Sequence, residues 1–305
     1  MRTLLMSATA LGALAIAGPA GAHDHGAMVA DKIDLSTPEG VVAAQRKLWC
    51  SLNEGEVVVW WWNGDAFSRR TGERDKKLFE VEGMNIRACY SDQHPERGAG
   101  FTTVSREILL YKDPDTGEVL STWDNPWTGE TVDVLHVAND PVNAAIYEIG
   151  RSGQPMTWSG DGVGDNWWST NTIPLFYQNV LGGAYQAEVG GTYHATEMFN
   201  FMGDTSDLLD LSKPIGDVKV GWARMSDWLP WMKMGGRDGI IYMHTAGVKL
   251  ESYDELSETM KREIAEHYPE YAEPPPKGDD RKNETSWTYY LKVQNGEITP
   301  PDRSQ

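Results

Sequence analysis

The sequence is short of cysteine, of positive charge and of long apolar segments, and each shortage excludes a class of protein. Two cysteines without a Cys-x-x-Cys spacing argue against a thiol redox centre or a structural zinc site. The 27 Lys and Arg residues face 45 Asp and Glu residues, and this net charge of −18 opposes binding to nucleic acid or anionic lipid. No segment beyond the amino terminus is apolar enough to span a membrane.

Short catalytic motifs are missing as well. The chain has no His-Glu-x-x-His, Gly-x-Ser-x-Gly, P-loop or dinucleotide fingerprint. The stretch GDGVG at residues 160–164 resembles a glycine loop, but it lacks the strand-to-helix context and is interpreted as a turn. An active site must therefore be inferred from strand geometry rather than from a motif.

The amino terminus has the pattern of a secretory signal. Arg2 precedes an apolar stretch at residues 4–17, and Ala20-Gly21-Ala22 provides a small-residue cleavage site. We expect residues 1–22 to be a cleaved signal peptide and residues 23–36 a flexible arm; an uncleaved anchor is the alternative. The predicted location is periplasmic or secreted.

Cleavage would leave His23-Asp24-His25 at the new terminus. A free amine, two amides and the third-position imidazole can form a square-planar Cu(II) or Ni(II) site. A functionless arm is the alternative reading, and no other cofactor is predicted.

Cys50 and Cys89 are an even pair in a chain predicted to reach an oxidising compartment. We expect them to form a disulfide, with two buried thiols as the alternative.

The run from Gly100 to Val142 predicts an antiparallel meander. Two Asp/Asn-Pro-x-Thr-Gly-Glu turns, at 113–118 and 125–130, separate segments rich in Val, Leu, Thr and Trp. Strand patterns also predict β-structure at residues 56–62, 78–90, 101–112, 118–124, 130–138, 144–149, 185–202, 219–225, 239–250 and 285–293. Residues 150–183, rich in glycine and tryptophan, suggest a long functional loop.

Helical patterns are fewer. A helix is predicted at 38–52 with Ser36 as its cap, a short one at 226–234, and a carboxyl-terminal one at 252–268 that opens with a Ser252–Glu255 capping box. The expected fold is mainly β: a large antiparallel β-barrel, or a calycin-like or sandwich meander, in a single domain at residues 37–305.

Thirteen tryptophans are the strongest anomaly of composition. Indoles are typical of ligand pockets but also of apolar cores, so both readings stay open. On the first reading, a flat aromatic ligand would contact Trp60, Trp62, Trp123, Trp158 and Trp222, with His136 at the same site.

Strand alternation supplies candidate catalytic groups. Tyr193 and Glu197 share one face of a strand and His194 takes the other, while Tyr242 and His244 share a face of a later strand. Each of these side chains is a candidate for a pocket or for a structural role. Arg224 shares a face with Trp222 and must meet an acid such as Glu197, or a ligand anion, if it is buried.

The stretch LLYKDPDTGEVLSTWDNPWTGETVDVLHVANDPVN, with the Trp-rich segment and Tyr193-His194, resembles the family known as domain of unknown function 1838. That family occurs in bacteria and fungi, often with a secretory signal. The resemblance implies no activity and no catalytic residues.

The leading hypothesis is an exported, cofactor-independent lyase, hydratase, isomerase or hydrolase that acts on a hydrophobic, aromatic small molecule in a Trp-rich barrel cavity. His194 or His244 would be the base, Tyr193 or Tyr242 the proton donor, and Arg224 the stabiliser of negative charge. The alternatives are a lipocalin-like carrier of an apolar ligand and a periplasmic metal-handling protein. Nothing in the sequence indicates the oligomeric state.

Overall fold

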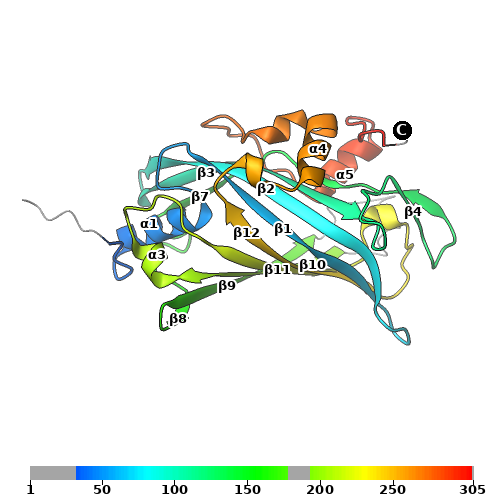
Figure 1. The fold of residues 1–305 in the computed structure, drawn as a ribbon, viewed down its shortest axis with the longest axis horizontal. Helices are drawn as coiled ribbons and strands as arrows, with labels where there is room; N and C mark the ends of the chain where they lie inside the picture. The colour runs from blue at the N-terminus through cyan, green and yellow to red at the C-terminus, as the bar shows by residue number, and fades with distance from the viewer. Residues whose placement is uncertain (1–31, 178–192, 304–305) are drawn as a thin grey trace, which may run out of the picture. The chain divides into compact units, whose positions relative to one another are not determined.

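One antiparallel sheet dominates the fold, as the strand-rich sequence predicts. The computed structural model describes residues 32–177 and 193–303. The strands of the sheet are β1 (Val57–Arg69), β2 (Lys76–His94), β3 (Gly98–Lys112), β6 (Val137–Asn139), β7 (Ala144–Tyr147), β8 (Asp161–Val163), β9 (Asn166–Tyr177), β10 (Tyr193–Asp204), β11 (Lys219–Ser226) and β12 (Ile240–Leu250). Their order is β6-β3-β2-β1-β12-β11-β10-β9-β8, with β7 also beside β3 (Figure 1).

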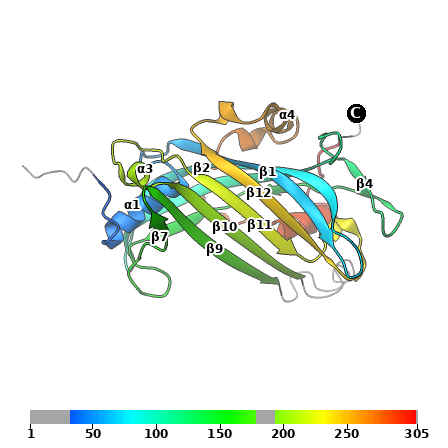
Figure 2. The same cartoon turned by 60° about the horizontal axis from the view of Figure 1, so that its bottom comes forward.

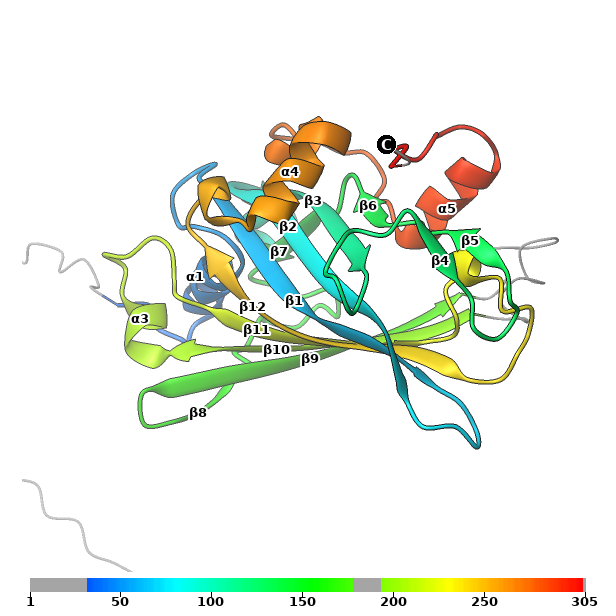
Figure 3. The ribbon, with the colours of Figure 1, turned by 45° about the vertical axis from the view of Figure 1, so that its right-hand side comes forward.

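The sheet does not close, so the expectation of a barrel is wrong. Among the described residues, β8 lies at one edge, β6 and β7 lie at the other, and no strand pairing joins the two edges. Strands β9 to β12 run side by side in Figure 2, and Figure 3 shows them across from β2 and β3. The curled, open sheet is compatible with the sandwich-like alternative.

The meander after β3 forms as predicted, but its middle part leaves the main sheet. Gly117 and Gly129 close the two turns with φ angles of 73° and 74°, a region that side chains with a Cβ avoid. Between and after these turns, β4 (Thr122–Asp124) and β5 (Thr131–Asp133) pair only with each other in a separate two-stranded sheet. The chain then returns beside β3 as β6.

Residues 150–183 are not a long loop where the structure describes them. The glycines and asparagines suggested irregular backbone, but β8 and β9 form a hairpin there, and β9 pairs with β10 along twelve residue pairs. Cross-strand pairing outweighs the weak strand propensity of this segment.

The predicted helices form with shifted boundaries. Helix α1 (Pro38–Trp49) is capped by Thr37, whose hydroxyl accepts a hydrogen bond from the Gly40 N–H at 3.0 Å, rather than by Ser36. The Ser252–Glu255 capping box is present but opens only the 3-10 turn η2 (Tyr253–Glu255). The other helical elements are α3 (Thr205–Leu209), η1 (Pro230–Met232), α4 (Glu258–His267), η3 (Pro269–Ala272) and α5 (Ser286–Gln294).

Helix α5 replaces the strand predicted at 285–293. Thr285 accepts a hydrogen bond from the Thr288 N–H and Thr288 bonds back to the Thr285 N–H, so a reciprocal cap starts a helix in a segment whose composition suits a strand. None of the described helices is long and apolar enough to cross a bilayer.

The predicted signal peptide at 1–22 lies outside the described residues. The predicted arm is described only from residue 32 onward, and that part is packed: Ile33 is buried, and its N–H donates to the Leu209 carbonyl at 2.9 Å. The predicted Cys50–Cys89 disulfide is confirmed and ties the end of α1 to β2.

The two faces of the sheet have different coverings. On the outer face, α4 and η3 pack over an apolar cluster that includes Val59, Met84 and Ile108 (Figure 1). On the inner face, α1 and α5 lie toward opposite ends of the sheet (Figure 3). Helix α1 packs against Trp60 and Phe201, and α5 joins a larger cluster around Phe79, Tyr111, Trp222 and Trp231. The middle of the inner face carries the polar groups.

Candidate functional site

A row of inward-facing side chains crosses four neighbouring strands. Trp60 on β1 pairs with Asn85 on β2, Asn85 with Glu107 on β3, and Glu107 with Asn139 on β6. Directly opposed residues of an antiparallel pair point to the same side, so the register alone places these four side chains in line. The Asn139 amide donates to a Glu107 carboxyl oxygen at 3.2 Å.

A second polar group comes from the other half of the sheet. Glu197 on β10 pairs with Arg224 on β11, and their side chains form an ion pair with a distance of 2.8 Å from Nη1 to Oε1. Arg224 also donates through Nη2 to the hydroxyl of Tyr193 at 3.0 Å. Burial opposes the charge of Arg224, but Tyr193 and Glu197 raise its pKa above the ordinary value, so it remains a cation.

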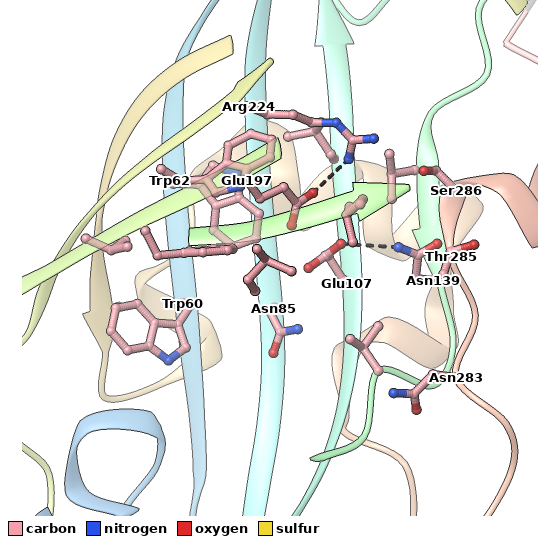
Figure 4. A pocket seen from close by; sticks show the side chains of 18 of the residues that line it. Trp60, Trp62, Asn85, Glu107, Asn139, Glu197, Arg224, Asn283, Thr285 and Ser286 are labelled. Atoms are coloured by element: carbon pink, nitrogen blue, oxygen red, sulfur yellow. Dashed lines mark hydrogen bonds and ion pairs between the residues drawn. The ribbon is translucent and has the colours of Figure 1, made fainter. Parts of the chain in front are cut away.

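The two halves enclose a cavity of about 510 Å³, within the usual range for small-molecule sites. Figure 4 shows the row on β1, β2, β3 and β6 and the Glu197–Arg224 pair on its walls. Residues 283–287, at the start of α5, line it as well. The apolar part of the wall consists of Trp49, Trp60, Trp62, Leu109, Val137, Val142, Ile173, Leu175, Phe199, Phe201, Val220, Trp222 and Trp287.

Glu107 is the carboxyl group of the site whose pKa is raised into the neutral range. Burial raises the pKa of Glu107 to about 7, and the negative charge of Glu197 adds to the rise. The hydrogen bond from Asn139 and the charges of Arg87 and Arg224 act in the opposite direction but do not cancel it. A carboxyl group with this pKa can accept and donate a proton at neutral pH.

Arg87 is a second cation in the cavity wall, two residues along β2 from Asn85. Its Nε donates to the Asn85 side-chain oxygen at 2.8 Å, and its guanidinium carbon lies 5.1 Å from the ring centroid of Trp49. Burial lowers the pKa of Arg87 to about 10 against the opposing charge of Glu107, so the group is still charged at neutral pH. Its Nη atoms form no hydrogen bond with any residue in the described ranges.

Trp62 reaches the cavity through a gap left by two glycines. Gly83 on β2 and Gly247 on β12 are its direct cross-strand partners, and a Cβ at either position would collide with it. The Trp62 Nε1 is buried and has no hydrogen-bond partner among the described residues. A buried indole N–H normally has a partner, and this one lies over Gly83 as an unsatisfied donor.

Several residues singled out in the sequence come together at this cavity. Glu197 and Arg224 line it and Tyr193 binds Arg224, so these three candidates form one hydrogen-bonded group. Trp60, Trp62 and Trp222 also line the cavity. The prediction that Tyr193 and Glu197 share a face is confirmed by the register of β10.

The predicted histidine bases and Tyr242 lie elsewhere. His194 is exposed on the opposite face of β10, with its Nδ1 3.4 Å from Asp227. His244 is exposed and lies opposite Ala223 and Asp65, on the outer face of β12. Tyr242 shares that face and donates to Asp75 at 3.0 Å. Strand alternation correctly predicts that Tyr242 and His244 share a face and that His194 opposes Tyr193. It does not predict which face of β10 or β12 points into the cavity.

His136 and two tryptophans also lie away from the cavity wall. His136 is buried, accepts the Tyr111 N–H at 3.0 Å and contacts the Leu120 carbonyl, and burial lowers its pKa to about 3. Trp123 packs on Phe79 and Trp231 in the core near α5. Trp158 packs edge-on against Trp167. Each of these side chains has a packing role in the structure.

The predicted copper or nickel ligands, His23 and His25, lie outside the described residues. Within residues 32–177 and 193–303, no group of three or more His, Cys, Asp or Glu side chains is arranged to hold a metal ion.

Sequence reasoning missed Asn85, Arg87, Glu107 and Asn139. An available signal was the alternation in β3, where Glu107 occupies the same face as Leu109 and Tyr111, both buried. An acid that shares a strand face with large apolar residues is typical of a carboxyl group that is partly buried for a purpose.

Comparison with known proteins agrees with the resemblance described above. A search of curated proteins finds no significant match. The family model described as protein of unknown function (DUF1838) matches residues 55–294, which contain every strand of the curled sheet and every polar residue of the cavity. The chain therefore belongs to the DUF1838 family.

Proposed function

We propose that this protein is an exported acid–base enzyme that acts on a hydrophobic, aromatic small molecule in the cavity of its curled sheet, without a bound cofactor. The observation that carries the proposal is Glu107, a carboxyl group with a pKa of about 7 on the wall of a cavity of about 510 Å³. The disulfide between Cys50 and Cys89 supports export to an oxidising compartment.

Each group has a chemical role in this scheme. Glu107 removes a proton from the substrate and returns it to another atom, or to a leaving group, as a lyase, hydratase, isomerase or hydrolase requires. Arg224, fixed by Glu197 and Tyr193, provides a positive charge where negative charge develops on the substrate. Trp60, Trp62 and Trp222 offer apolar surface for a flat ring.

The polar lining favours an enzyme over the alternative of a carrier. A carrier of an apolar ligand needs an apolar cavity, and a buried charge without a partner is costly there. This cavity instead contains two acids and two arginines on four strands, and a third acid, Glu284, in the segment before α5. Such an arrangement is better explained by a need for charge in the reaction.

The test uses a metabolite extract of the protein's own host, so that no substrate has to be guessed. Purified protein at catalytic concentration is incubated with the extract, and untargeted mass spectrometry follows which compounds disappear and which form. We expect one compound to be converted in many-fold excess over protein, and Glu107→Gln to slow its conversion by about 10²-fold or more.

The matched control is Glu118→Gln, which removes an exposed carboxyl group in the first turn after β3 and should leave the conversion unchanged. A compound depleted only in proportion to the protein, and recovered intact after denaturation, would indicate a carrier and contradict the proposal.

A further inference from the structure

The two arginines of the cavity differ in how they are neutralised. Arg224 has an acid at 2.8 Å and a phenol at 3.0 Å. Arg87 has only the Asn85 side-chain oxygen on its Nε and the face of Trp49 beside it. No acid in the described part of the chain forms an ion pair with Arg87, and the hydrogen bond that Glu107 accepts comes from the Asn139 amide.

Asn85 has a free donor beside this cation. Asn85 is 3 % exposed and lines the cavity, and its side-chain oxygen accepts the hydrogen bond from Arg87, so the amide NH₂ is the group left for a ligand. The amide nitrogen makes no hydrogen bond to any described residue. A planar guanidinium and a neighbouring amide donor form a recognition surface suited to a carboxylate, which accepts two parallel N–H bonds.

We propose that the molecule bound in this cavity is a small organic acid, with its carboxylate on Arg87 and Asn85 and its flat apolar body against Trp60 and Trp62. The inference rests on the proposed function, because it takes this acid to be the substrate on which Glu107 acts. Trp60 is the cross-strand partner of Asn85, so the polar and apolar contacts lie next to each other on the sheet.

The charges around the site favour a single negative group on the ligand. The side chains that face Glu107 and bear charge are Arg87 on β2, Glu197 on β10 and Arg224 on β11, and Glu284 lines the cavity from the segment before α5. Glu284 forms an ion pair with Lys292 and Glu197 forms one with Arg224. With these two ion pairs formed and Glu107 protonated, the positive charge of Arg87 is the one left without a counter-charge among these groups. A single carboxylate on the ligand would neutralise it.

The experiment is a calorimetric titration of the purified protein with 2-naphthoate and with its neutral counterpart 2-naphthamide. Both probes have the same flat ring system, and they differ in charge at the group that Arg87 would bind. We expect naphthoate to bind about tenfold or more tightly than naphthamide, and Arg87→Met to remove that preference. Arg262→Met, which deletes an exposed cation on α4, is the matched control and should keep it.

Arg87→Lys covers the case in which the methionine variant does not fold. It keeps the positive charge but loses the planar pair of donors, so naphthoate binding should weaken by several-fold while naphthamide binding stays the same. Three results would each overturn the inference: equal affinity for the two probes, no detectable binding of naphthoate, or an equal loss of the naphthoate preference in Arg87→Met and Arg262→Met.

The number of protons taken up when naphthoate binds distinguishes this inference from the proposed function. An anion next to Glu107 favours its protonated form, so titrations at pH 7.5 in buffers of different ionisation enthalpy should show proton uptake by the wild type and none by Glu107→Gln. The glutamine variant should still bind naphthoate. If Glu107→Gln retains full turnover, the proposed function fails while the binding of acids by Arg87 stands.

Discussion

At the scale of single residues, the site depends on one carboxyl group that the fold holds in an unfavourable environment. The carboxyl group of Glu107 is removed from water in the cavity wall and lies near the acid Glu197, and both effects favour its neutral form. A carboxyl group in such an environment lowers the folding stability of the protein, and proteins usually retain one because it serves an active site.

Glu107→Gln should therefore change how stability depends on pH. The pKa of Glu107 is about 7 in the folded protein and 4.5 as the reference value, so the folded state binds more protons between these pH values. The stabilisation from this proton is complete below pH 4.5 and is lost as pH rises through 7, by up to about 3 kcal/mol. Glutamine cannot ionise, so the variant should gain stability relative to the wild type from pH 5 to pH 8.

Urea unfolding of both proteins at pH 5 and pH 8 measures this difference. Glu118→Gln is the control and should follow the wild type within about 0.5 kcal/mol at both pH values. If Glu107→Gln and the wild type have the same pH dependence, the carboxyl group is not perturbed as described.

The sequence indicates part of this residue-scale arrangement. Alternation correctly places Tyr193 with Glu197, and Trp222 with Arg224, because the period of a strand is fixed. It could not show that His194 and His244 lie on the outer face, and for Glu107 it offered only the shared face with Leu109 and Tyr111. The inner face depends on how strands far apart in the sequence curl together.

At the scale of elements, the register between strands shapes the cavity as much as the residue types do. The indole of Trp62 fits because it lies over Gly83, while Gly247 on the other neighbouring strand leaves room for the backbone and Cβ of Trp62. Gly83 and Gly247 have no positive φ, so the space they leave explains their presence better than backbone conformation does.

Gly83→Ala should consequently disturb the cavity. The added methyl group collides with the Trp62 ring and must push it or the strand aside, at a cost of about 1–3 kcal/mol. Gly221→Ala on β11 is the matched control, because its Cβ would meet no atom closer than 3.8 Å, and it should be neutral or slightly stabilising. Urea unfolding and tryptophan fluorescence compare the two; an unchanged Gly83→Ala protein would contradict the packing described here.

Helix α5 shows why some elements could not be predicted. The segment Trp287–Val293 combines aromatic and apolar residues that suit a buried strand as well as a helix. The reciprocal hydrogen bonds of Thr285 and Thr288 and the contact of Trp287 with Tyr193, at 4.3 Å between ring centroids, favour the helix. Contacts of this kind are tertiary and leave no periodic signal.

At the scale of the whole molecule, the open sheet is the main departure from the prediction. The strands and turns are local features and were largely predictable, whereas closure would have required β8 to pair with β6 or β7. Clusters around α1 and α5 fill the two ends of the inner face instead. The cavity lies between these two clusters, so the curled sheet and its end clusters bound the cavity although the barrel is not closed.

The disulfide joins α1 to this sheet and should contribute strongly to stability. Cys50 and Cys89 are 39 residues apart, and the chain-entropy model gives about 4 kcal/mol for a loop of this length. Cys50→Ser with Cys89→Ser should lower the free energy of unfolding by about that amount. Urea unfolding of the oxidised wild type and the double variant measures the difference, and a loss below about 1 kcal/mol would show that the other contacts of α1 are enough to hold it, contrary to this prediction.

The proposed reaction requires that Glu107 exchange its proton near neutral pH inside the cavity. The most direct measurement is a pH titration of the glutamate side-chain carboxyl carbons by NMR with ¹³C-labelled glutamate, in which the signal missing from Glu107→Gln identifies the residue. The account predicts a midpoint near pH 7 for that signal. A midpoint near 4.5, the reference value for glutamate, would contradict it.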